Sequence, residues 1–229
     1  MTVAPDPIGQ AVHDYFYKQL NKNITIYSDD FEPDTVKPAY FFRSFGQMPP
    51  LEQLAMQNVR GTVLDIGACA GCHTLYLQQQ GIDVSALEQS ALCCDVMKQR
   101  GIKQVVQTDF FQFTGSKFDT LLLLMNGSGL AGTLQNFPAF LRQLKSVLKP
   151  GGQILMDSSD LIYLLMNEDG SVDLDLNAVR YYGELIYQLE YLKIKGAKFP
   201  WLYIDRDLLA GLLEAEKLKI DKIDEGGHF

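Results

Sequence analysis

The spacing of apolar residues changes along the chain and divides it into three stretches. Between Thr62 and Met156, short apolar runs alternate with segments in which apolar residues recur at helical spacing. An apolar run of about four to eight residues is typical of a buried strand. We therefore expect strands at Thr62 to Ile66, Asp83 to Leu87, Gln104 to Thr108, Phe118 to Leu124 and Gln153 to Met156.

Helices are expected between these strands. The helical spacing covers Gly71 to Gln80, Ser90 to Arg100 and Phe137 to Leu148. Ser90 has the hydroxyl side chain that is preferred at the N-cap of a helix. Strands that alternate with helices predict an α/β fold with a doubly wound, mostly parallel sheet.

The N-terminal stretch has a different pattern. Asp14 to Leu20 is amphipathic and predicts a helix, Ser28 to Pro38 is acidic and broken by proline, and Leu51 to Asn58 predicts a short helix. A chain of 229 residues corresponds to one domain, with room for a small addition. We therefore expect residues 1–60 to form an N-terminal helical cap or lid and residues 61–229 to form the main domain.

The C-terminal stretch predicts an antiparallel unit. Side chains alternate from Tyr182 to Lys193, and Phe199 to Ile204 is extended, which together are typical of a β-hairpin. We place this C-terminal hairpin insertion at about residues 178–204. A helix is expected from Asp205 to Lys217, followed by a strand at Leu218 to Ile223.

Small and acidic residues follow the first strand of the alternating stretch. Asp65 lies near the end of that strand, and Gly67, Ala68 and Gly71 come directly after it. Open parallel sheets bind ligands at the carboxyl ends of their strands, at the point where the strand order reverses. Because glycine has no Cβ, the backbone here can turn sharply and approach a ligand. The segment therefore predicts a ligand-binding loop.

The next three strand ends carry groups suited to a nucleoside. Glu88 ends the second strand, and its carboxylate can accept hydrogen bonds from both hydroxyls of a ribose. Asp109 follows the third strand and can accept from an adenine amino group, while the backbone N–H of Phe110 can donate to the ring. Asn126 begins a turn of small residues after the fourth strand. The ordered set of strand ends predicts a nucleoside-containing ligand.

Five segments resemble the motifs of class I S-adenosylmethionine-dependent methyltransferases. They are VLDIGACAGCHTLYL (63–77), ALEQS (86–90), TDFFQF (108–113), FDTLLLLMNGSG (118–129) and LKPGGQILMD (148–157). The resemblance covers about residues 60–159 and departs from the family pattern at Cys69, where the family usually has glycine. It implies a Rossmann-like sheet of the seven-stranded type, S-adenosyl-L-methionine as cofactor, S-adenosyl-L-homocysteine as product, and direct SN2 methyl transfer.

The resemblance also implies roles for single residues. Asp65 would orient the methionine amino group, Gly67 and Asn126 would offer backbone carbonyls, Glu88 would hold the ribose, and Arg43 is a candidate partner for the methionine carboxylate. The implied cofactor-binding set is Asp65, Gly67, Ala68, Gly71, Glu88, Gln89, Asp109, Phe110, Asn126 and Arg43.

The acceptor is less defined. Asp157, Ser158, Tyr181 and Tyr182 are candidates for substrate contact by their positions, and no catalytic residue is assigned. The formal net charge of −8 and the lack of a dense Lys/Arg cluster disfavour a nucleic-acid acceptor. We therefore expect a small-molecule acceptor.

Three other interpretations were weighed. The first is a non-catalytic module that binds S-adenosylmethionine or S-adenosylhomocysteine. The second is a nicotinamide oxidoreductase, which is disfavoured because Cys69 and Cys72 stand where the dinucleotide fingerprint has glycines. The third is a zinc or redox site at the four cysteines, and it is disfavoured because the adjacent pair Cys93 and Cys94 has poor ligand spacing. We therefore expect no metal.

The cellular setting is expected to be the cytoplasm. The sequence has no apolar run of about 18 residues and no basic, then apolar, leader at its N-terminus. We expect reduced cysteines, no membrane partner, and no particular oligomeric state.

Overall fold

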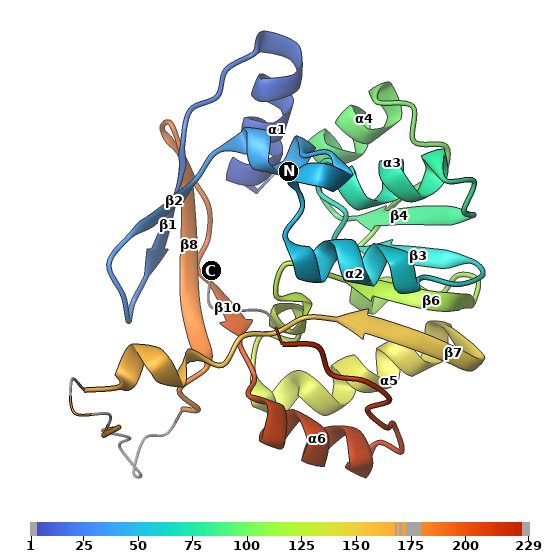
Figure 1. The fold of residues 1–229 in the computed structure, drawn as a ribbon. Coiled ribbons are helices and arrows are strands. Elements are labelled where there is room, and N and C mark those ends of the chain that lie inside the picture. The colour runs from blue at the N-terminus through green and yellow to red at the C-terminus, as the bar shows by residue number, and fades with distance from the viewer. Residues whose placement is uncertain (1–3, 168, 170, 173–179, 226–229) are drawn as a thin grey trace.

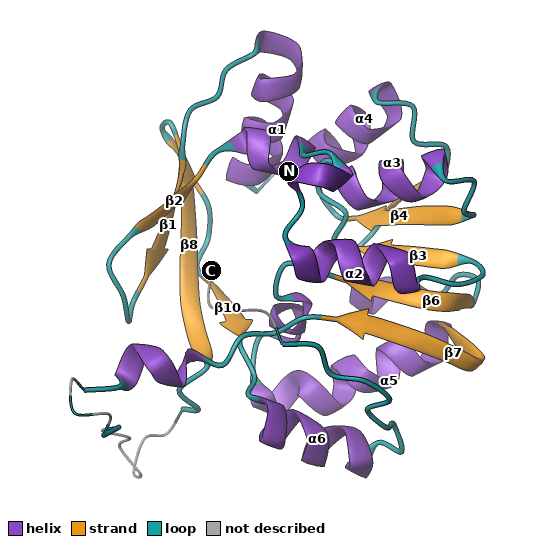
Figure 2. Cartoon of the chain, viewed as in Figure 1, coloured by secondary structure: helices purple, strands orange, loops and turns teal. Residues whose placement is uncertain are grey.

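The computed structural model describes residues 4–167, 169, 171–172 and 180–225. Two sheets organise these residues (Figure 1). One is parallel and carries helices on both faces, and the other is antiparallel. The strands of the parallel sheet point toward the antiparallel sheet (Figure 2), so their carboxyl ends lie between the two.

The parallel sheet has the order β5-β4-β3-β6-β7. Its strands are β3 (Val63–Ile66), β4 (Val84–Glu88), β5 (Val105–Gln107), β6 (Phe118–Leu123) and β7 (Leu148–Met156). All of their pairings are parallel, and β3 lies between β4 and β6. The doubly wound parallel sheet predicted from the alternating stretch is therefore confirmed.

Apolar residues on both sides of each strand bury this sheet between two layers. On β3, Val63 packs into one cluster with Met56 and Leu77, while its neighbour Leu64 packs into the opposite cluster. Phe140 belongs to that opposite cluster. Because successive side chains of a strand point to opposite faces, an uninterrupted apolar strand needs helices on both sides.

The helices begin where the sequence offers a cap. Ser90 accepts a hydrogen bond from the backbone N–H of Cys93, so the predicted N-cap is confirmed. Asp205 accepts from the N–H groups of Asp207 and Leu208 and caps the helix expected to begin there. The α-helices are α1 (Pro7–Lys18), α2 (Pro50–Asn58), α3 (Cys72–Gln79), α4 (Ala91–Gln99), α5 (Phe137–Val147) and α6 (Arg206–Ala215). The 3-10 helices are η1 (Pro38–Phe42), η2 (Phe45–Gln47), η3 (Phe110–Gln112), η4 (Gly127–Ala131), η5 (Leu134–Asn136) and η6 (Leu161–Leu165).

The antiparallel sheet joins the two ends of the chain. Its strands are β1 (Ile24–Ser28), β2 (Asp34–Val36), β8 (Glu184–Tyr191), β9 (Ile194–Lys195) and β10 (Phe199–Leu202). The strand β8 pairs with β10 and β9, as the predicted hairpin requires, and also with β1. The N-terminal segment is therefore not purely helical, and the stretch expected to be an acidic loop contains β2.

The parallel sheet has five strands, and the antiparallel strands form a sheet of their own. One further expectation needs correction. The strand expected at Leu218 to Ile223 is wrong, since these residues are irregular after α6. Residues 178 and 179 of the expected insertion lie outside the described residues.

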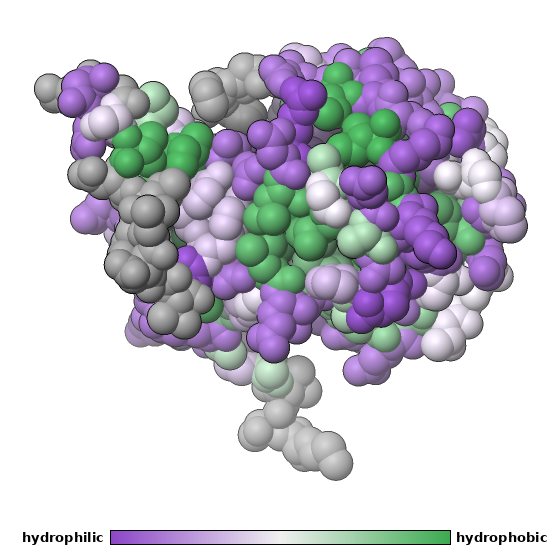
Figure 3. Space-filling model, turned by 90° about the horizontal axis from the view of Figure 1, so that it is seen from below, coloured by the Kyte–Doolittle hydropathy of each residue, from purple (hydrophilic) through white to green (hydrophobic). Residues whose placement is uncertain are grey.

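The outer surface is mostly polar. Seen from the α6 end, hydrophobic residues reach it in small groups, one of them at η6 beside the grey residues (Figure 3). Leu164 and Met166 are exposed there. None of the helices in the described ranges is long and apolar enough to cross a membrane.

Candidate functional site

A small cavity lies where the strand order of the parallel sheet reverses. The chain runs from β3 to β4 and β5 on one side, and then returns to β6 and β7 on the other. The loops after β3 and β6 border an enclosed space of about 20 Å³. It is lined by Phe41, Asp65, Ile66, Gly67, Ala68, Cys69, Cys72, His73, Leu124 and Met125. This is the position at which open α/β sheets bind ligands.

The backbone of both loops is strained. Cys69 has φ +50°, Met125 +67° and Asn126 +60°, all in the left-handed region that disfavours residues with a Cβ. Such conformations persist where the surrounding structure holds them, and they concentrate at functional sites. The cysteine that replaces the usual glycine therefore keeps the glycine-like backbone.

The two glycines of the loop after β3 have different uses. Gly67 has φ +75°, and a Cβ built on it would meet nothing within 4 Å. Gly71 has φ +76°, but its Cβ would lie 2.3 Å from Cδ1 of Ile102. Gly67 therefore borders open space, as a ligand-binding backbone should. Gly71 allows the loop to pack against the core, because a side chain there would overlap Ile102.

Asp65 lies at the floor of the cavity and is buried. One of its carboxylate oxygens accepts a hydrogen bond of 2.6 Å from the Thr74 hydroxyl. Burial raises the pKa of Asp65, and the nearby His73 opposes this shift. A buried carboxylate with a raised pKa next to a cavity is a functional-site candidate, because burying a charge without a ligand is unfavourable.

Glu88 ends β4 beside the same loop. Its two oxygens accept hydrogen bonds of 2.9 Å from the backbone N–H groups of Cys69 and Ser90. Burial raises the pKa of Glu88 despite these bonds. A carboxylate has about four lone-pair positions, so two remain for a ligand. Gln89, the next residue, is exposed.

The polar groups that follow β5 and β6 already have hydrogen-bond partners within the protein. One oxygen of Asp109 accepts from the Phe111 N–H at 2.7 Å, and the Phe110 ring is buried in the core. The backbone carbonyl of Asn126 accepts from the Gly129 N–H at 2.9 Å, so it already has one donor. The Asn126 side-chain oxygen accepts from the Ser159 hydroxyl.

Asp157, after β7, holds the strained loop that follows β6. Its carboxylate accepts hydrogen bonds from the backbone N–H groups of Met125 (3.2 Å), Asn126 (2.8 Å) and Gly127 (3.3 Å). Burial raises its pKa. Asp65, Glu88 and Asp157 thus place three carboxyl groups with raised pKa values around the strand ends.

An ion network that the sequence analysis missed lies beside the cavity. The Glu52 carboxylate of α2 accepts from Nη2 of Arg43 at 2.6 Å and lies 2.8 Å from Nε2 of His73. The side chains of all three residues are less than a tenth exposed. Burial opposes the charge of His73, but its hydrogen bonds with Cys72 and Glu52 raise its pKa to about 10.

In this network Arg43 already has partners within the protein. Its guanidinium is bound by Glu52, donates to the Tyr40 carbonyl at 2.7 Å, and stacks over the Tyr40 ring at 4.1 Å. It does not line the cavity. Glu52 and His73 carried no motif that predicts this pairing. The only signal was their place in helices next to the glycine loop.

The other acceptor candidates have structural partners. The Ser158 hydroxyl accepts from the Ile204 N–H at 2.9 Å. The Tyr181 hydroxyl donates to Asp205, the N-cap of α6, at 2.6 Å, and the Tyr182 hydroxyl donates to Asp160 at 2.7 Å. None of the three lines the cavity.

The cysteines are free thiols. Cys72, Cys93 and Cys94 are buried, and Cys69 is partly buried. Among the described residues, no group of three or more His, Cys, Asp or Glu side chains is arranged to hold a metal ion.

The arrangement suits a ligand that has a cation and a ribose. Buried carboxylates favour a positively charged partner. The Glu88 carboxylate offers hydrogen-bond acceptors, and the Gly67 backbone is open to a ligand because nothing lies within 4 Å of where its Cβ would be. Neither loop has the glycine spacing that cradles a pyrophosphate. The cavity holds about one water, so it takes only part of a nucleoside-containing ligand, and the rest of that ligand has to lie over the neighbouring strand ends.

Comparisons with known proteins agree with this geometry. Residues 64–156 match the family described as Methyltransferase domain. The chain is similar to a Bacteroides fragilis S-adenosylmethionine-dependent methyltransferase whose crystal structure contains S-adenosyl-L-homocysteine. The two share 42% identity over 100% of this chain and 93% of that chain, with a TM-score of 0.91.

Two more distant similarities are narrower. A Streptomyces cypemycin N-terminal methyltransferase is 31% identical over 103 residues, which are 43% of this chain. The chain spans 42% of the length of this curated relative. The CcbJ methyltransferase of Streptomyces caelestis has a TM-score of 0.56 and 16% identity over 78% of this chain and 93% of its own, and shows the fold alone.

Proposed function

Because the chain belongs to the class I S-adenosylmethionine-dependent methyltransferases, we propose that it transfers the methyl group of this cofactor to a small molecule. The observation that carries the proposal is the cavity between the loops after β3 and β6, with buried Asp65 at its floor. The related structure with bound S-adenosyl-L-homocysteine covers this whole chain and supports the same cofactor.

The strand ends provide the cofactor contacts that we propose. Asp65 orients the methionine amino group and Gly67 offers its carbonyl beside Ala68. Glu88 accepts from the ribose hydroxyls next to Gln89, and Asp109 and the Phe110 amide face the adenine. The Asn126 carbonyl, which already accepts from Gly129, has one further lone pair for the amino group. Arg43 and Gly71 act indirectly, by holding α2 and the loop in place.

The protein's chemical task is alignment. When bound, S-adenosylmethionine supplies a methyl group that is already activated by its sulfonium. The residues around the cavity then have to hold the acceptor atom in line with that methyl group and exclude water. Asp157 contributes by holding Met125 and Asn126 in their left-handed conformations at the edge of the cavity.

The first experiment is a calorimetric titration of S-adenosyl-L-homocysteine into the wild type and Glu88→Ala. Hydrogen bonds to charged groups contribute about 1.5–3 kcal/mol, so we expect the variant to bind about 10- to 100-fold more weakly. NAD should not bind to either protein.

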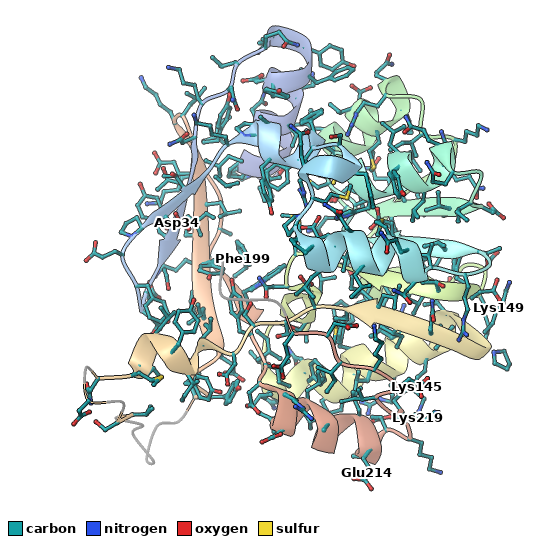
Figure 4. All side chains as sticks on the ribbon, in the orientation of Figure 1. Asp34, Lys145, Lys149, Phe199, Glu214 and Lys219 are labelled. Carbon is teal, nitrogen blue, oxygen red and sulfur yellow. The ribbon has the colours of Figure 1, made fainter. Side chains whose placement is uncertain are left out.

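Glu214→Ala is the matched control, because Glu214 is exposed on α6, at the far end of the molecule from β4 (Figure 4). It should bind like the wild type. Equal affinities in all three proteins would remove Glu88 from the site, and no binding to the wild type would contradict the cofactor proposal. Binding without turnover on any acceptor would favour a non-catalytic module that senses the cofactor.

A further inference from the structure

One face of the antiparallel sheet carries a group of aromatic side chains next to the cavity. The backbone register places Phe199 of β10 opposite Tyr187 of β8, and Trp201 opposite Leu185, so these side chains share a face. Tyr203 follows β10 and continues it. The rings of Tyr187 and Phe199 lie 6.3 Å apart, those of Tyr187 and Tyr203 6.4 Å, and those of Phe199 and Trp201 6.2 Å.

This face is turned toward the methyl-transfer site. Leu189 shares the Tyr187 side of β8, because alternate residues of a strand point the same way. It packs in one cluster with Phe41 and Met125, both of which line the cavity. Figure 4 shows Phe199 between β8 and the parallel half of the molecule. We call Tyr187, Phe199, Trp201 and Tyr203 the aromatic wall.

The Trp201 end of the aromatic wall contacts η4, which follows the loop after β6. A Cβ on Gly129, in η4 after the β6 loop, would overlap the Trp201 ring, so the indole lies directly against that backbone. The Tyr203 and Tyr187 hydroxyls are 3.0 Å apart. Burial raises the pKa of Tyr203, and the charge of Asp157 adds to this shift, as it does for Tyr40 of η1.

The charge of this face is negative. Asp34 of β2 lies opposite Ile26, which lies opposite Leu189, so Asp34 is on the same face. Asp34 is exposed, and the one hydrogen bond its carboxylate makes within the described residues is with the adjacent Thr35 N–H. The lysine of these strands, Lys195, stacks over Tyr27 on the opposite face at 4.5 Å.

From this face we infer that the aromatic wall and Asp34 bind a small amine, which arrives as a cation and is methylated on nitrogen. This inference about the acceptor class rests on the proposed function. Aromatic faces attract ammonium groups, and the Asp34 carboxylate strengthens the preference for a cation over a neutral or anionic ligand. A carboxylate or phosphate acceptor would meet the Asp34 carboxylate on this face and be repelled. Hydroxyl acceptors would gain nothing from the charge of this face.

In the proposed transfer step, the ammonium first loses one proton to water and becomes a neutral amine with a lone pair. That lone pair forms the N–C bond to the methyl group while the C–S bond breaks, and the electron pair of that bond goes to sulfur, leaving neutral S-adenosylhomocysteine. The product is an ammonium with one more methyl group.

The test uses two probes of similar size and opposite charge, 2-phenylethylamine and 3-phenylpropionate. Each is titrated into the full chain saturated with S-adenosyl-L-homocysteine. Trp201 is the sole tryptophan, so its fluorescence reports directly on the wall. We expect the amine to bind at least about tenfold more tightly than the carboxylate.

Variants then locate the contact. Asp34→Asn and Tyr187→Leu should each weaken amine binding by about three- to tenfold, with unchanged affinity for S-adenosyl-L-homocysteine. Tyr187→Phe keeps the ring and should bind the amine like the wild type. Asp29→Asn is the charge control, because Asp29 lies beyond the end of β1 and bonds to Lys198 at 2.6 Å.

The outcomes separate this inference from the proposed function. Loss of S-adenosyl-L-homocysteine binding in the wild type would contradict the proposed function itself. If that ligand binds, three results overturn the amine inference: equal or tighter binding of the carboxylate, no binding of either probe, or amine binding that is unchanged in both Asp34→Asn and Tyr187→Leu.

Discussion

At the scale of single residues, the site depends on backbone conformations that its residue types disfavour. Cys69, Met125 and Asn126 all have positive φ values in the two loops that border the cavity. A residue with a Cβ in this region costs about 1–2 kcal/mol, which the neighbouring contacts must offset. For the loop after β3 these include the Glu88 carboxylate on the Cys69 N–H, and for the loop after β6 the Asp157 carboxylate.

Substitutions at Cys69 test this balance. Cys69→Gly removes the strain but also loses a partly buried side chain, so we expect a change in unfolding free energy within about 1 kcal/mol and near-normal S-adenosyl-L-homocysteine binding. Cys69→Val places a β-branched residue at φ +50° and should destabilise by at least about 2 kcal/mol. Urea unfolding and calorimetry measure both effects. Equal stability of the two variants would contradict the strain.

At the scale of elements, three separate segments meet at one buried carboxylate. Arg43 follows η1, Glu52 is in α2 and His73 is in the first turn of α3. Glu52 contacts both cations, and burial alone would raise its pKa, yet the hydrogen bonds from His73 and Arg43 lower it. The network therefore ties the N-terminal segment to the helix that begins at the glycine loop.

Glu52→Gln should therefore be strongly destabilising. Removing one partner of a buried ion pair typically costs about 3–5 kcal/mol, because the remaining charges stay buried and uncompensated. Glu216→Gln is the matched control, since Glu216 pairs with Arg142 at 2.9 Å in an exposed position and should cost less than about 1 kcal/mol. Chemical denaturation compares them. A loss below about 1 kcal/mol in Glu52→Gln would show that the network contributes little.

At the scale of the whole molecule, function and stability oppose each other around the strand ends. Asp65, Glu88 and Asp157 have raised pKa values because they are buried, so their charged forms cost stability at neutral pH. A cationic ligand at the site would offset this cost. We therefore expect cofactor and acceptor binding to stabilise the native state, by an amount that grows with the logarithm of ligand concentration once that concentration exceeds Kd.

The pH dependence of unfolding tests the charge of His73. Its pKa in the folded protein is about 10 against 6.5 in the unfolded chain, so its stabilisation is complete below about pH 6.5 and is lost as pH rises toward 10. The wild type should lose about 4 kcal/mol of this stabilisation between pH 6 and 9.5, since one pKa unit is about 1.4 kcal/mol. Urea unfolding from pH 6 to 9.5 measures this loss, which should be absent from His73→Gln. Parallel curves for the two proteins would contradict a protonated His73.

Much of the core could be predicted because its signals are local. An apolar strand, a Ser90 cap and a short carboxylate-ended strand each depend on residues that are neighbours in sequence. The same locality explains the correct order of Asp65, Glu88 and Asp109 at successive strand ends, since parallel strands bring their carboxyl ends to one edge.

The sequence by itself therefore determined the parallel core, the residues at its strand ends and the family. Only the tertiary structure decided that β1 joins β8, where Thr25 lies opposite Glu190, and that Arg43 pairs with Glu52. Pairings between such distant segments are selected by packing and by the burial of charge, which no local pattern records. The aromatic wall itself lies within the predicted C-terminal hairpin, but only the pairing of β1 with β8 and β2 places Asp34 on the same face.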